Sequence, residues 1–293
     1  MASPPRVCGL LVASGVVAFF FLIRRRRRDD GISPRARVVA IIGDPVGVTR
    51  TSLVFPRYTP KAVLIPLDVP ASKLATTLRG LFGARNFDGL VVTKPHKENV
   101  VALCDRLSSV ARSVGAVNCV RRCRDGLLYG ANFDGAGFVE GLRKRYPAFL
   151  DAPRTCLLVG AGGAARAIAR ELVATGHRVR VTNRTLARAT DLAAAIPGVE
   201  VATTLEPGYD LVVQCTSLGH SPDDPLPIDP SILVPPTLCA EIIMNPPQTR
   251  FLEAARNRGC RCHAGRHMLD AQLQLLATFL ATTDDHVFNR LFT

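Results

Sequence analysis

The stretch Leu157-Leu-Val-Gly-Ala-Gly-Gly-Ala-Ala165 decides the fold of the second half of this 293-residue chain. An apolar run is followed at once by a glycine turn and then by a helix-like pattern from Ala164 to Thr175. A dinucleotide pyrophosphate needs this order of strand, turn and helix, because the N–H groups at the start of the helix face the phosphates. Gly160 permits the tight turn, Gly162 lets the backbone approach the phosphates, and Ala165 lets the helix pack closely on the strand. The glycine pattern alone is not specific, so the residues that follow it decide the interpretation.

The segment after the next expected strand indicates which dinucleotide binds. A site for NAD places Asp or Glu roughly 20 residues further on, at the end of that strand, to bind the ribose 2′-hydroxyl. Here the strand Arg178 to Thr182 is followed by Asn183-Arg184-Thr185 without a carboxylate, and Arg188 comes one helical turn later. Guanidinium groups and a hydroxyl suit a 2′-phosphate. The sequence therefore predicts NADP(H) as cofactor, and the alternative is a solvated loop with ordinary surface arginines.

Length and composition fit a globular enzyme of about two domains. The 23 glycines and 21 prolines are spread along the chain, without a low-complexity stretch or a repeat of fixed period. The formal net charge is +13, but Arg24 to Arg28 supply five of these charges, and no basic stripe is interleaved with aromatic residues. We therefore expect no nucleic-acid partner.

The nine cysteines are scattered, mostly within apolar runs, in a chain too large to need a disulfide framework. This usage predicts a reducing compartment. The segment Cys260-Arg-Cys262-His263 suggests a metal ligand set, but it has no second matching pair to complete four ligands. We predict no metal site and interpret these cysteines as buried strand residues.

The N-terminal segment, residues 1–38, differs from the rest of the chain. Val7 to Ile23 is an uncharged apolar run that Arg24 to Arg28 follow directly. Its length is at the lower limit for a spanning helix, roughly 17 residues. This pattern predicts that residues 7–28 contact a membrane. Because arginines favour the cytoplasmic face, the rest of the chain is expected on that side. The alternatives are an organelle-targeting segment, a start codon assigned too far upstream, or a dispensable tail.

From residue 37 onward, apolar runs alternate with helical patterns, which predicts an α/β fold with parallel sheets. In the first half the expected strands are 38–42, 63–66, 89–93, 115–120 and 127–131, and the expected helices are 71–82 and 99–107. A second unit begins near Thr155, with further strands at 178–182, 210–213 and 238–243 and helices at 164–175 and 248–258. Leu269, Leu273, Leu276 and Leu280 are spaced as on one face of an amphipathic helix. Its polar start, Gly265 to Gln272, suggests that this helix returns to the cleft of the first domain.

Polar residues gather after the third, fourth and fifth expected strands. Thr93-Lys-Pro-His-Lys97 follows the third strand, at the end where parallel sheets place ligand contacts. Gly115-Ala-Val-Asn118 and Gly130-Ala-Asn-Phe-Asp134 can bring an amide and a carboxylate to the same cleft.

With these blocks in order, the sequence resembles the shikimate and quinate dehydrogenase family from about Val38 to Phe279. The matching blocks are Gly43 to Pro45, Thr93 to Lys97, Gly115 to Asn118, Asn132 to Asp134, the glycine turn, Asn183 to Thr185, Thr216 to Gly219, Asn245-Pro246 and Gly265 to Gln272. The resemblance implies two α/β domains: a substrate-binding catalytic domain at 39–138 with a mainly parallel sheet, and a Rossmann-type NADP domain at 139–262. Residues 263–293 would form C-terminal helices that pack on the first domain.

The resemblance also implies roles for individual residues. Lys97 and Asp134 would be the catalytic pair, since hydride arriving at a ring carbonyl creates negative charge on oxygen and requires a proton there. The other reading of this pair is an ordinary surface ion pair. The expected substrate-binding residues are Thr49, Thr51, Thr93, Asn118 and Gln272. The expected cofactor-binding residues are Gly160, Gly162, Gly163, Ala164, Asn183, Arg184, Thr185, Arg188, Thr216, Gly265 and Met268.

The chain departs from the family where the ring carboxylate is held. The family's Ser-x-Ser is Thr49-Arg50-Thr51 here, and three other polar positions are Val91, Phe133 and Met244. Each lost donor leaves a substrate group unpaired, at a cost of about 1–3 kcal/mol. Arg50, Arg266 or His267 are candidates to replace the carboxylate contact.

These observations together predict an NADP-dependent oxidoreductase that interconverts a ring ketone and a secondary alcohol on a cyclic hydroxy acid such as 3-dehydroshikimate. The alternatives are a quinate or other cyclitol dehydrogenase and a non-catalytic protein that senses NADP or a metabolite. Folate-linked methylene dehydrogenase chemistry fits less well with the Asn132 and Asp134 block. We expect a monomer or homodimer in the cytoplasm, with a membrane anchor at the N-terminus as one interpretation of residues 1–38.

Overall fold

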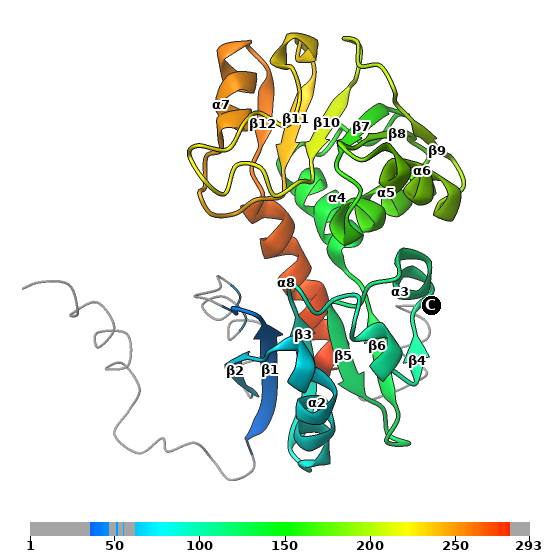
Figure 1. Cartoon of the computed structure of the whole chain (residues 1–293), viewed down its shortest axis with the longest axis vertical. Helices are drawn as coiled ribbons and strands as arrows, with labels where there is room; N and C mark the ends of the chain where they lie inside the picture. Colours follow the sequence, from blue (N-terminus) through cyan, green and yellow to red (C-terminus); the bar gives the residue numbers. More distant parts are fainter. Residues whose placement is uncertain (1–35, 47–50, 52–54, 56–61, 282–293) are drawn as a thin grey trace, which may run out of the picture. The chain divides into compact units, whose positions relative to one another are not determined.

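The computed structural model describes residues 36–46, 51, 55 and 62–281. The first six strands form one sheet in the order β2-β1-β3-β5-β6-β4 (Figure 1). Their bounds are β1 Arg37–Gly43, β2 Ala62–Asp68, β3 Phe87–Val92, β4 Arg106–Leu107, β5 Cys119–Arg122 and β6 Leu128–Ala131. Strands β2, β1 and β3 are parallel, whereas β5 runs antiparallel to both β3 and β6. The predicted mainly parallel sheet is confirmed, with one reversed strand.

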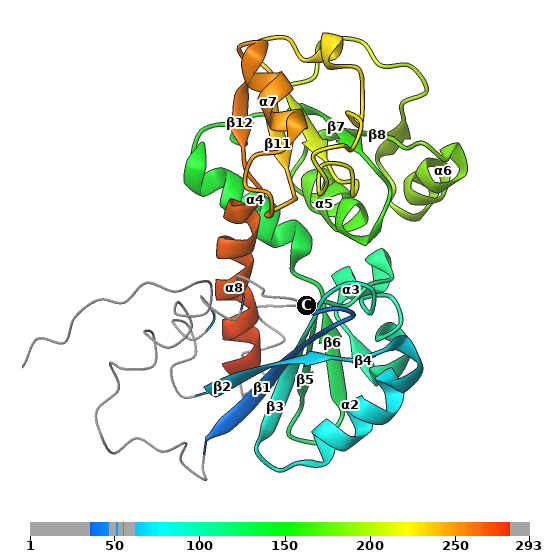
Figure 2. The same ribbon diagram turned by 60° about the vertical axis from the view of Figure 1, so that its left-hand side comes forward.

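Alternating side chains of this sheet bury its two faces. Ala40 and Ile42 pack with α2 (Leu74–Gly83), which the short 3₁₀ helix η3 (Ala71–Lys73) precedes. Val39 and Ile41 pack on the other face, against apolar residues of α8 (Arg266–Ala281). This alternation is the period of two that a strand requires. Figure 2 shows α2 and α8 beside the strands of this sheet.

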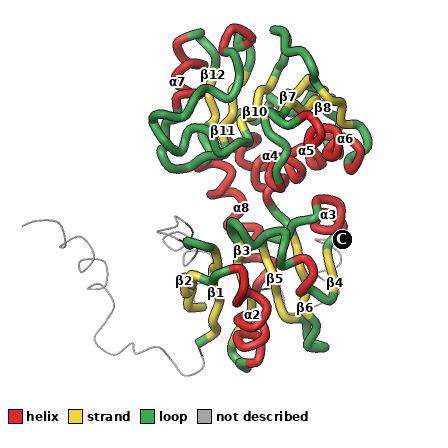
Figure 3. Tube along the Cα trace, viewed as in Figure 1, coloured by secondary structure: helices red, strands yellow, loops and turns green. Residues whose placement is uncertain are grey.

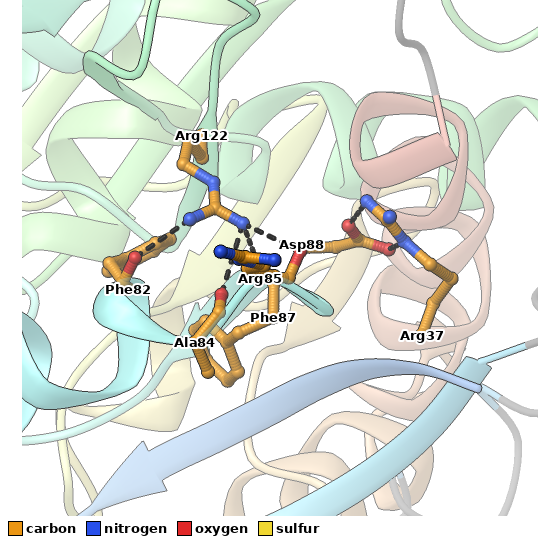
Figure 4. A network of polar contacts seen from close by, with 7 residues as sticks. All are labelled: Arg37, Phe82, Ala84, Arg85, Phe87, Asp88 and Arg122. Carbon is orange, nitrogen blue, oxygen red and sulfur yellow. Dashed lines mark hydrogen bonds and ion pairs between the residues drawn. The ribbon is translucent and has the colours of Figure 1, made fainter. Parts of the chain in front are cut away.

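A partly buried arginine side chain fastens the end of α2 to the sheet (Figure 4). The Arg122 guanidinium donates hydrogen bonds to the carbonyl oxygens of Phe82, Ala84, Arg85 and Phe87, at 2.8 to 3.1 Å. The planar fork of arginine suits several acceptors at once, and these bonds satisfy carbonyls that the end of a helix leaves without partners. Nearby, Arg37 forms an ion pair with Asp88, which ties the start of β1 to β3.

The first half differs from the sequence expectation in three places. The predicted helix 99–107 is wrong: it is a turn followed by the 3₁₀ helix η4 (Val101–Leu103) and β4. Pairing of β4 with β6 replaces the helical bonds there. The strand expected at 115–120 begins only at Cys119, since Gly115 has a φ of 69° and ends the helix α3 (Ser109–Val114). Sequence reasoning missed α3, although the Ser108 side chain caps its start.

The second sheet is parallel throughout, in the order β12-β11-β10-β7-β8-β9. Its strands are β7 Thr155–Val159, β8 Arg178–Thr182, β9 Val199–Val201, β10 Leu211–Gln214, β11 Leu238–Glu241 and β12 Arg261–His263. The helices α5 (Gly163–Ala174) and α6 (Leu186–Ala195) pack on one face, and α7 (Arg250–Asn257) packs on the other. The 3₁₀ helix η5 (Pro230–Ile232) precedes β11. This doubly covered parallel sheet confirms the predicted Rossmann-type domain.

Two long helices connect the sheets in sequence and contact each other, α4 (Asp134–Arg145) and α8 (Figure 3). Glycines allow the close approach. A Cβ at Gly137 would lie 2.7 Å from the Gln272 Cβ, and one at Gly141 would lie 2.6 Å from the His267 carbonyl oxygen. Helix α8 also contacts β3 and β5 of the first sheet, which confirms that the final helix returns to the first domain.

The possible membrane segment, residues 7–28, lies outside the described residues. Among the residues that the structure describes, no helix has the length and apolar character needed to cross a bilayer.

Candidate active site

A lysine and an aspartate from separate segments form the centre of the candidate site. Lys97 lies in the turn after β3, and Asp134 is the first residue of α4. The Lys97 Nζ donates a hydrogen bond to Asp134 Oδ2 at 2.7 Å. The Asp134 side chain is 3% exposed and that of Lys97 is 25% exposed, so the carboxylate is buried while the amine reaches the surface. This difference separates the pair from an ordinary surface ion pair.

The Asp134 carboxylate accepts hydrogen bonds from three side chains, Lys97 and two amides. Asn118 Nδ2 donates to Oδ1 at 2.9 Å, and the Gln272 Nε2 of α8 donates to the same oxygen. Burial raises the pKa of Asp134, but the Lys97 charge and the three side-chain hydrogen bonds outweigh burial, so its pKa lies below the ordinary value. Asp134 is therefore ionised at neutral pH and accepts a hydrogen bond from the Lys97 amine.

Two asparagines fix the junction between β6 and α4. Asn132 Oδ1 accepts from the backbone N–H of Asp134 at 2.9 Å, while its amide donates to the Ala116 carbonyl oxygen at 3.0 Å. Asn118 Oδ1 accepts from the backbone N–H of Phe133 at 3.0 Å. Sequence reasoning gave Asn132 no role, although an asparagine two residues before an acidic helix start is a recognisable turn signal.

The turn that carries Lys97 is held at several points. The His96 ring lies 2.6 Å, through Nε2, from the Val69 carbonyl oxygen, and the Val117 N–H donates to the Lys97 carbonyl oxygen at 2.8 Å. Thr93 follows β3 directly and donates its N–H to the Ile42 carbonyl oxygen at 2.9 Å. Thr51 is buried, and Thr49 and Arg50 lie outside the described residues.

The glycine turn has the geometry that the sequence predicts. Gly160 has a φ of 113°, a conformation that favours glycine, and a Cβ there would lie 3.0 Å from the Thr216 Cγ2. Gly162 is the N-cap of α5, and a Cβ there would meet nothing within 4 Å. Gly163 and Ala164 begin the helix. The start of α5 therefore has exposed N–H donors beside open space, which fits a bound phosphate group.

The predicted 2′-phosphate residues follow β8. Asn183 donates its amide to the Thr185 carbonyl oxygen at 2.9 Å, and the Arg188 N–H donates to the same oxygen at 3.1 Å. Arg184 and Arg188 are exposed. Their side chains are therefore accessible to solvent and can reach an anion at the end of β8.

The last two predicted cofactor residues lie where α8 begins. Gly265 packs against the carbonyl of Ile242, and Met268 is buried in the apolar cluster beside α4 and α5. His267 and Met244, two residues named where the chain departs from the family, are also described by the structure. His267 stacks on His263 at 5.0 Å between ring centroids, and Met244 is 42% exposed.

The apolar substitutions at two positions are buried. Val91 is 5% and Phe133 6% exposed, and both belong to the apolar cluster beneath α8. The Phe133 ring lies edge-on to Phe279 of α8, with ring centroids 5.3 Å apart. The residue directly before Asp134 therefore contributes an aromatic ring to the core.

Two α/β domains, a glycine turn of the dinucleotide-binding type and a lysine paired with a buried aspartate are the features of a pyridine-nucleotide oxidoreductase. Residues 41–120 match the shikimate dehydrogenase substrate-binding domain, and residues 149–217 match the shikimate / quinate 5-dehydrogenase domain. The chain belongs to the shikimate and quinate dehydrogenase family, as the sequence predicts.

Relatives in this family align over most of their length. A shikimate dehydrogenase (NADP(+)) from Rubrobacter xylanophilus is 37% identical over 81% of this chain and 88% of its own. One from Methylobacterium radiotolerans is 40% identical over 81% of this chain and 87% of its own. Among solved structures, the Thermus thermophilus shikimate 5-dehydrogenase in complex with NADP(H) and shikimate is 28% identical with a TM-score of 0.75, covering 87% of this chain and 97% of that one. A 5-ketofructose reductase of Gluconobacter is 32% identical with a TM-score of 0.74, covering 87% and 97%.

Proposed function

We propose that this protein is an NADP-dependent shikimate dehydrogenase, which interconverts 3-dehydroshikimate and shikimate. The curated relatives at 37% and 40% identity carry that name, and the chain spans nearly their whole length. The observation that carries the proposal is the 2.7 Å contact between the Lys97 Nζ and the buried Asp134 carboxylate.

NADPH supplies the hydride when it is bound, and the residues of this chain supply the proton. Negative charge grows on the substrate oxygen as the carbonyl is reduced. The Lys97 amine is partly exposed and is oriented by Asp134, so it is placed to donate a proton to that oxygen. The transfer leaves Lys97 one proton short beside the Asp134 carboxylate, and a proton from solvent, which the exposed side of Lys97 meets, replaces it.

The remaining proposed substrate contacts surround this pair. Asn118 and Gln272 each have an amide on the Asp134 carboxylate and an acceptor or donor left for a hydroxyl. Thr93, directly after β3, would position the ring, and Thr51 with Thr49 would bind the carboxylate. The shared contacts to Asp134 would fix which ring hydroxyl meets Lys97.

A direct assay tests this proposal. The purified protein is mixed with NADPH and 3-dehydroshikimate, and absorbance at the reduced nicotinamide band is followed, with 3-dehydroquinate and neutral keto polyols compared in parallel. We expect the fastest oxidation of NADPH with 3-dehydroshikimate. No oxidation of NADPH with any cyclic keto acid would contradict the proposal.

The proposed cofactor contacts give a prediction for Arg184 and Arg188. The double replacement R184A/R188A removes both guanidinium groups at the end of β8 and should weaken NADPH binding by about 2–3 kcal/mol, since hydrogen bonds to charged groups contribute about that much. NADH, which lacks the 2′-phosphate, should bind with unchanged affinity. Titration of each nucleotide by fluorescence measures the effect, and Arg178→Ala, at the exposed start of β8, is the matched control. Equal losses for both nucleotides would exclude a phosphate contact.

A second candidate is reduction of a neutral keto polyol. The buried Val91 and Phe133 favour it, because they place apolar groups where the family has polar ones. The 32% identical Gluconobacter structure is that of a 5-ketofructose reductase.

We also propose the boundaries 39–138, 139–262 and 263–293 for the substrate domain, the NADP domain and the returning C-terminal segment. Residues 1–38 would then lie outside both domains, with residues 7–28 as a possible anchor on the cytoplasmic side. A monomer or a homodimer satisfies this arrangement, because the proposed site uses residues of one chain.

A further inference from the structure

Two polar side chains are completely buried side by side at the carboxyl ends of neighbouring strands. Gln214 ends β10, Glu241 ends β11, and their Cα atoms are partners in the parallel ladder. Both side chains are 0% exposed. In a parallel sheet this edge holds the ligand contacts, so these residues lie beneath the loops that a nucleotide would touch.

Each of the two side chains shapes the loop that follows its own strand. Gln214 accepts from the Thr216 N–H at 2.5 Å and donates to the Leu218 carbonyl oxygen at 2.7 Å. Glu241 Oε1 accepts from the N–H groups of Ile242 and Ile243, both at 2.9 Å. The amide and the carboxyl therefore perform the same structural task, but only the carboxyl can change its charge.

Glu241 has polar neighbours, and within the described part of the chain no ion pair balances its charge. Thr249, the N-cap of α7, donates its hydroxyl to Oε2 at 3.0 Å. From β10 the neighbours are Gln214 and the Cys215 thiol, whose pKa is raised by burial and by the Glu241 charge. His263 of β12 is the ladder partner of Ala240, so it points to the opposite face of the sheet. Burial raises the pKa of Glu241 to about 7, against the lowering effect of its hydrogen bonds.

A carboxyl group in this environment destabilises the fold when it is ionised. Its pKa in the folded protein lies above the value of 4.5 that it has in the unfolded chain. The folded state therefore binds the proton more tightly, and its stability declines as the pH rises from 4.5 through 7. A neutral glutamine, as at position 214, would avoid that cost. A buried group that lowers stability beside a ligand-binding edge is a candidate for a functional role.

Close backbone contacts connect the Glu241 loop to the candidate site. A Cβ at Gly265 would lie 2.5 Å from the Ile243 carbonyl oxygen, and one at Gly219 would lie 3.3 Å from Thr249. Gly265 directly precedes α8, and Gln272 of α8 donates to Asp134. The loop at 242–243 therefore rests against the segment that starts α8, the helix whose Gln272 contacts the catalytic pair.

We propose that Glu241 is a positioning residue for NADP(H): its ionised carboxylate holds the Ile242 and Ile243 backbone against Gly265, and cofactor affinity depends on that charge. This inference rests on the proposed function. A hydrogen bond to a charged acceptor is stronger than one to a neutral acceptor. Protonation therefore weakens the support of the loop, and NADPH affinity should fall as the pH falls through the titration of Glu241.

The test compares wild type with Glu241→Gln. The dissociation constant of NADPH is measured by fluorescence between pH 6 and pH 8.5 for both proteins, because the 2′-phosphate of the cofactor also titrates near pH 6 and cancels in the ratio. At pH 8.5 the variant should bind NADPH about fivefold more weakly than wild type, and at pH 6 the two should agree. Glu253→Gln, an exposed carboxylate in the first turn of α7, should follow wild type throughout.

Each outcome of this comparison supports or contradicts the role of Glu241. A ratio of affinities that does not change with pH would overturn the role of Glu241 and leave the proposed function intact. Absence of NADPH binding by wild type at every pH would overturn both. If Glu241→Gln does not fold, Thr249→Ala is used instead. This variant removes one hydrogen-bond donor to the Glu241 carboxylate, so the midpoint of the pH dependence of NADPH affinity should move to higher pH than in wild type. Thr249→Ser, which keeps the hydroxyl, is the control. An unmoved midpoint would also overturn the inference.

Discussion

Replacement of Lys97 by alanine should lower kcat by about 1000-fold while the affinity for NADPH stays unchanged. The reason is that Lys97 supplies the proton for the reduced carbonyl, and a positioned general acid contributes about 10²–10⁴ in rate. The glycine turn and Arg184, where the cofactor is proposed to bind, belong to other segments. Steady-state kinetics with NADPH and 3-dehydroshikimate, together with nucleotide titration, measure the two effects separately.

Lys94 provides the matched control for this variant. It lies in the same turn but is exposed, so Lys94→Ala should keep nearly full activity. If both lysine variants retain the wild-type kcat, the catalytic assignment of Lys97 is wrong. A parallel loss of NADPH affinity in Lys97→Ala would instead indicate a folding or binding defect.

Gly135→Ala should be among the most damaging single changes to the stability of this fold. A Cβ at Gly135 would lie 2.2 Å from the Ala167 carbonyl oxygen, a backbone atom of α5 that no side-chain rotation can move away. Helices α4 and α5 would have to separate, and we expect the free energy of unfolding to fall by about 3 kcal/mol. The midpoint of urea denaturation, followed by circular dichroism, measures this change.

Gly80→Ala is the corresponding control. Gly80 lies within α2, and a Cβ there would meet nothing within 4 Å. Alanine should therefore stabilise the protein by about 0.5–1 kcal/mol, the ordinary advantage of alanine over glycine in a helix. If Gly135→Ala were as well tolerated as Gly80→Ala, the close packing of α4 on α5 would not hold in solution.

The second sheet could be predicted from the sequence because its signals are local. The strand Arg178–Thr182 has the predicted bounds, and α5 follows its glycine turn within one residue of the expected start. Apolar runs bounded by turn residues determine these elements before any tertiary contact forms. The family's polar blocks likewise indicated which side chains meet at Asp134.

The first half was harder to predict because tertiary pairing overrides local preference there. Residues 99–107 have a helical pattern. The Asp105 N–H nevertheless donates a hydrogen bond to the Leu128 carbonyl oxygen, and β4 pairs with β6. Sequence reasoning also treated Phe133 only as a lost polar contact. Its packing on Phe279 depends on a helix that returns from the far end of the chain.

The Glu241 environment illustrates a different limit of sequence reasoning. Glu241 lies inside the expected strand 238–243, but the strand ends at this residue and the two isoleucines after it belong to the loop. Its partners are two N–H groups of its own loop and the cap of α7, and its burial depends on the neighbouring strands. Only the folded chain brings these groups together, so the raised pKa of this carboxyl could not be foreseen.

The return of α8 to the first sheet constrains how genes of this kind can exchange parts. A single crossover between β6 and β7 would pair the first sheet of one parent with the α8 of the other. Gln272 and the apolar residues beneath it would then come from a different ancestor than Asp134 and β3, which they contact. A new substrate specificity acquired by recombination therefore needs two crossovers, the second one just before Gly265.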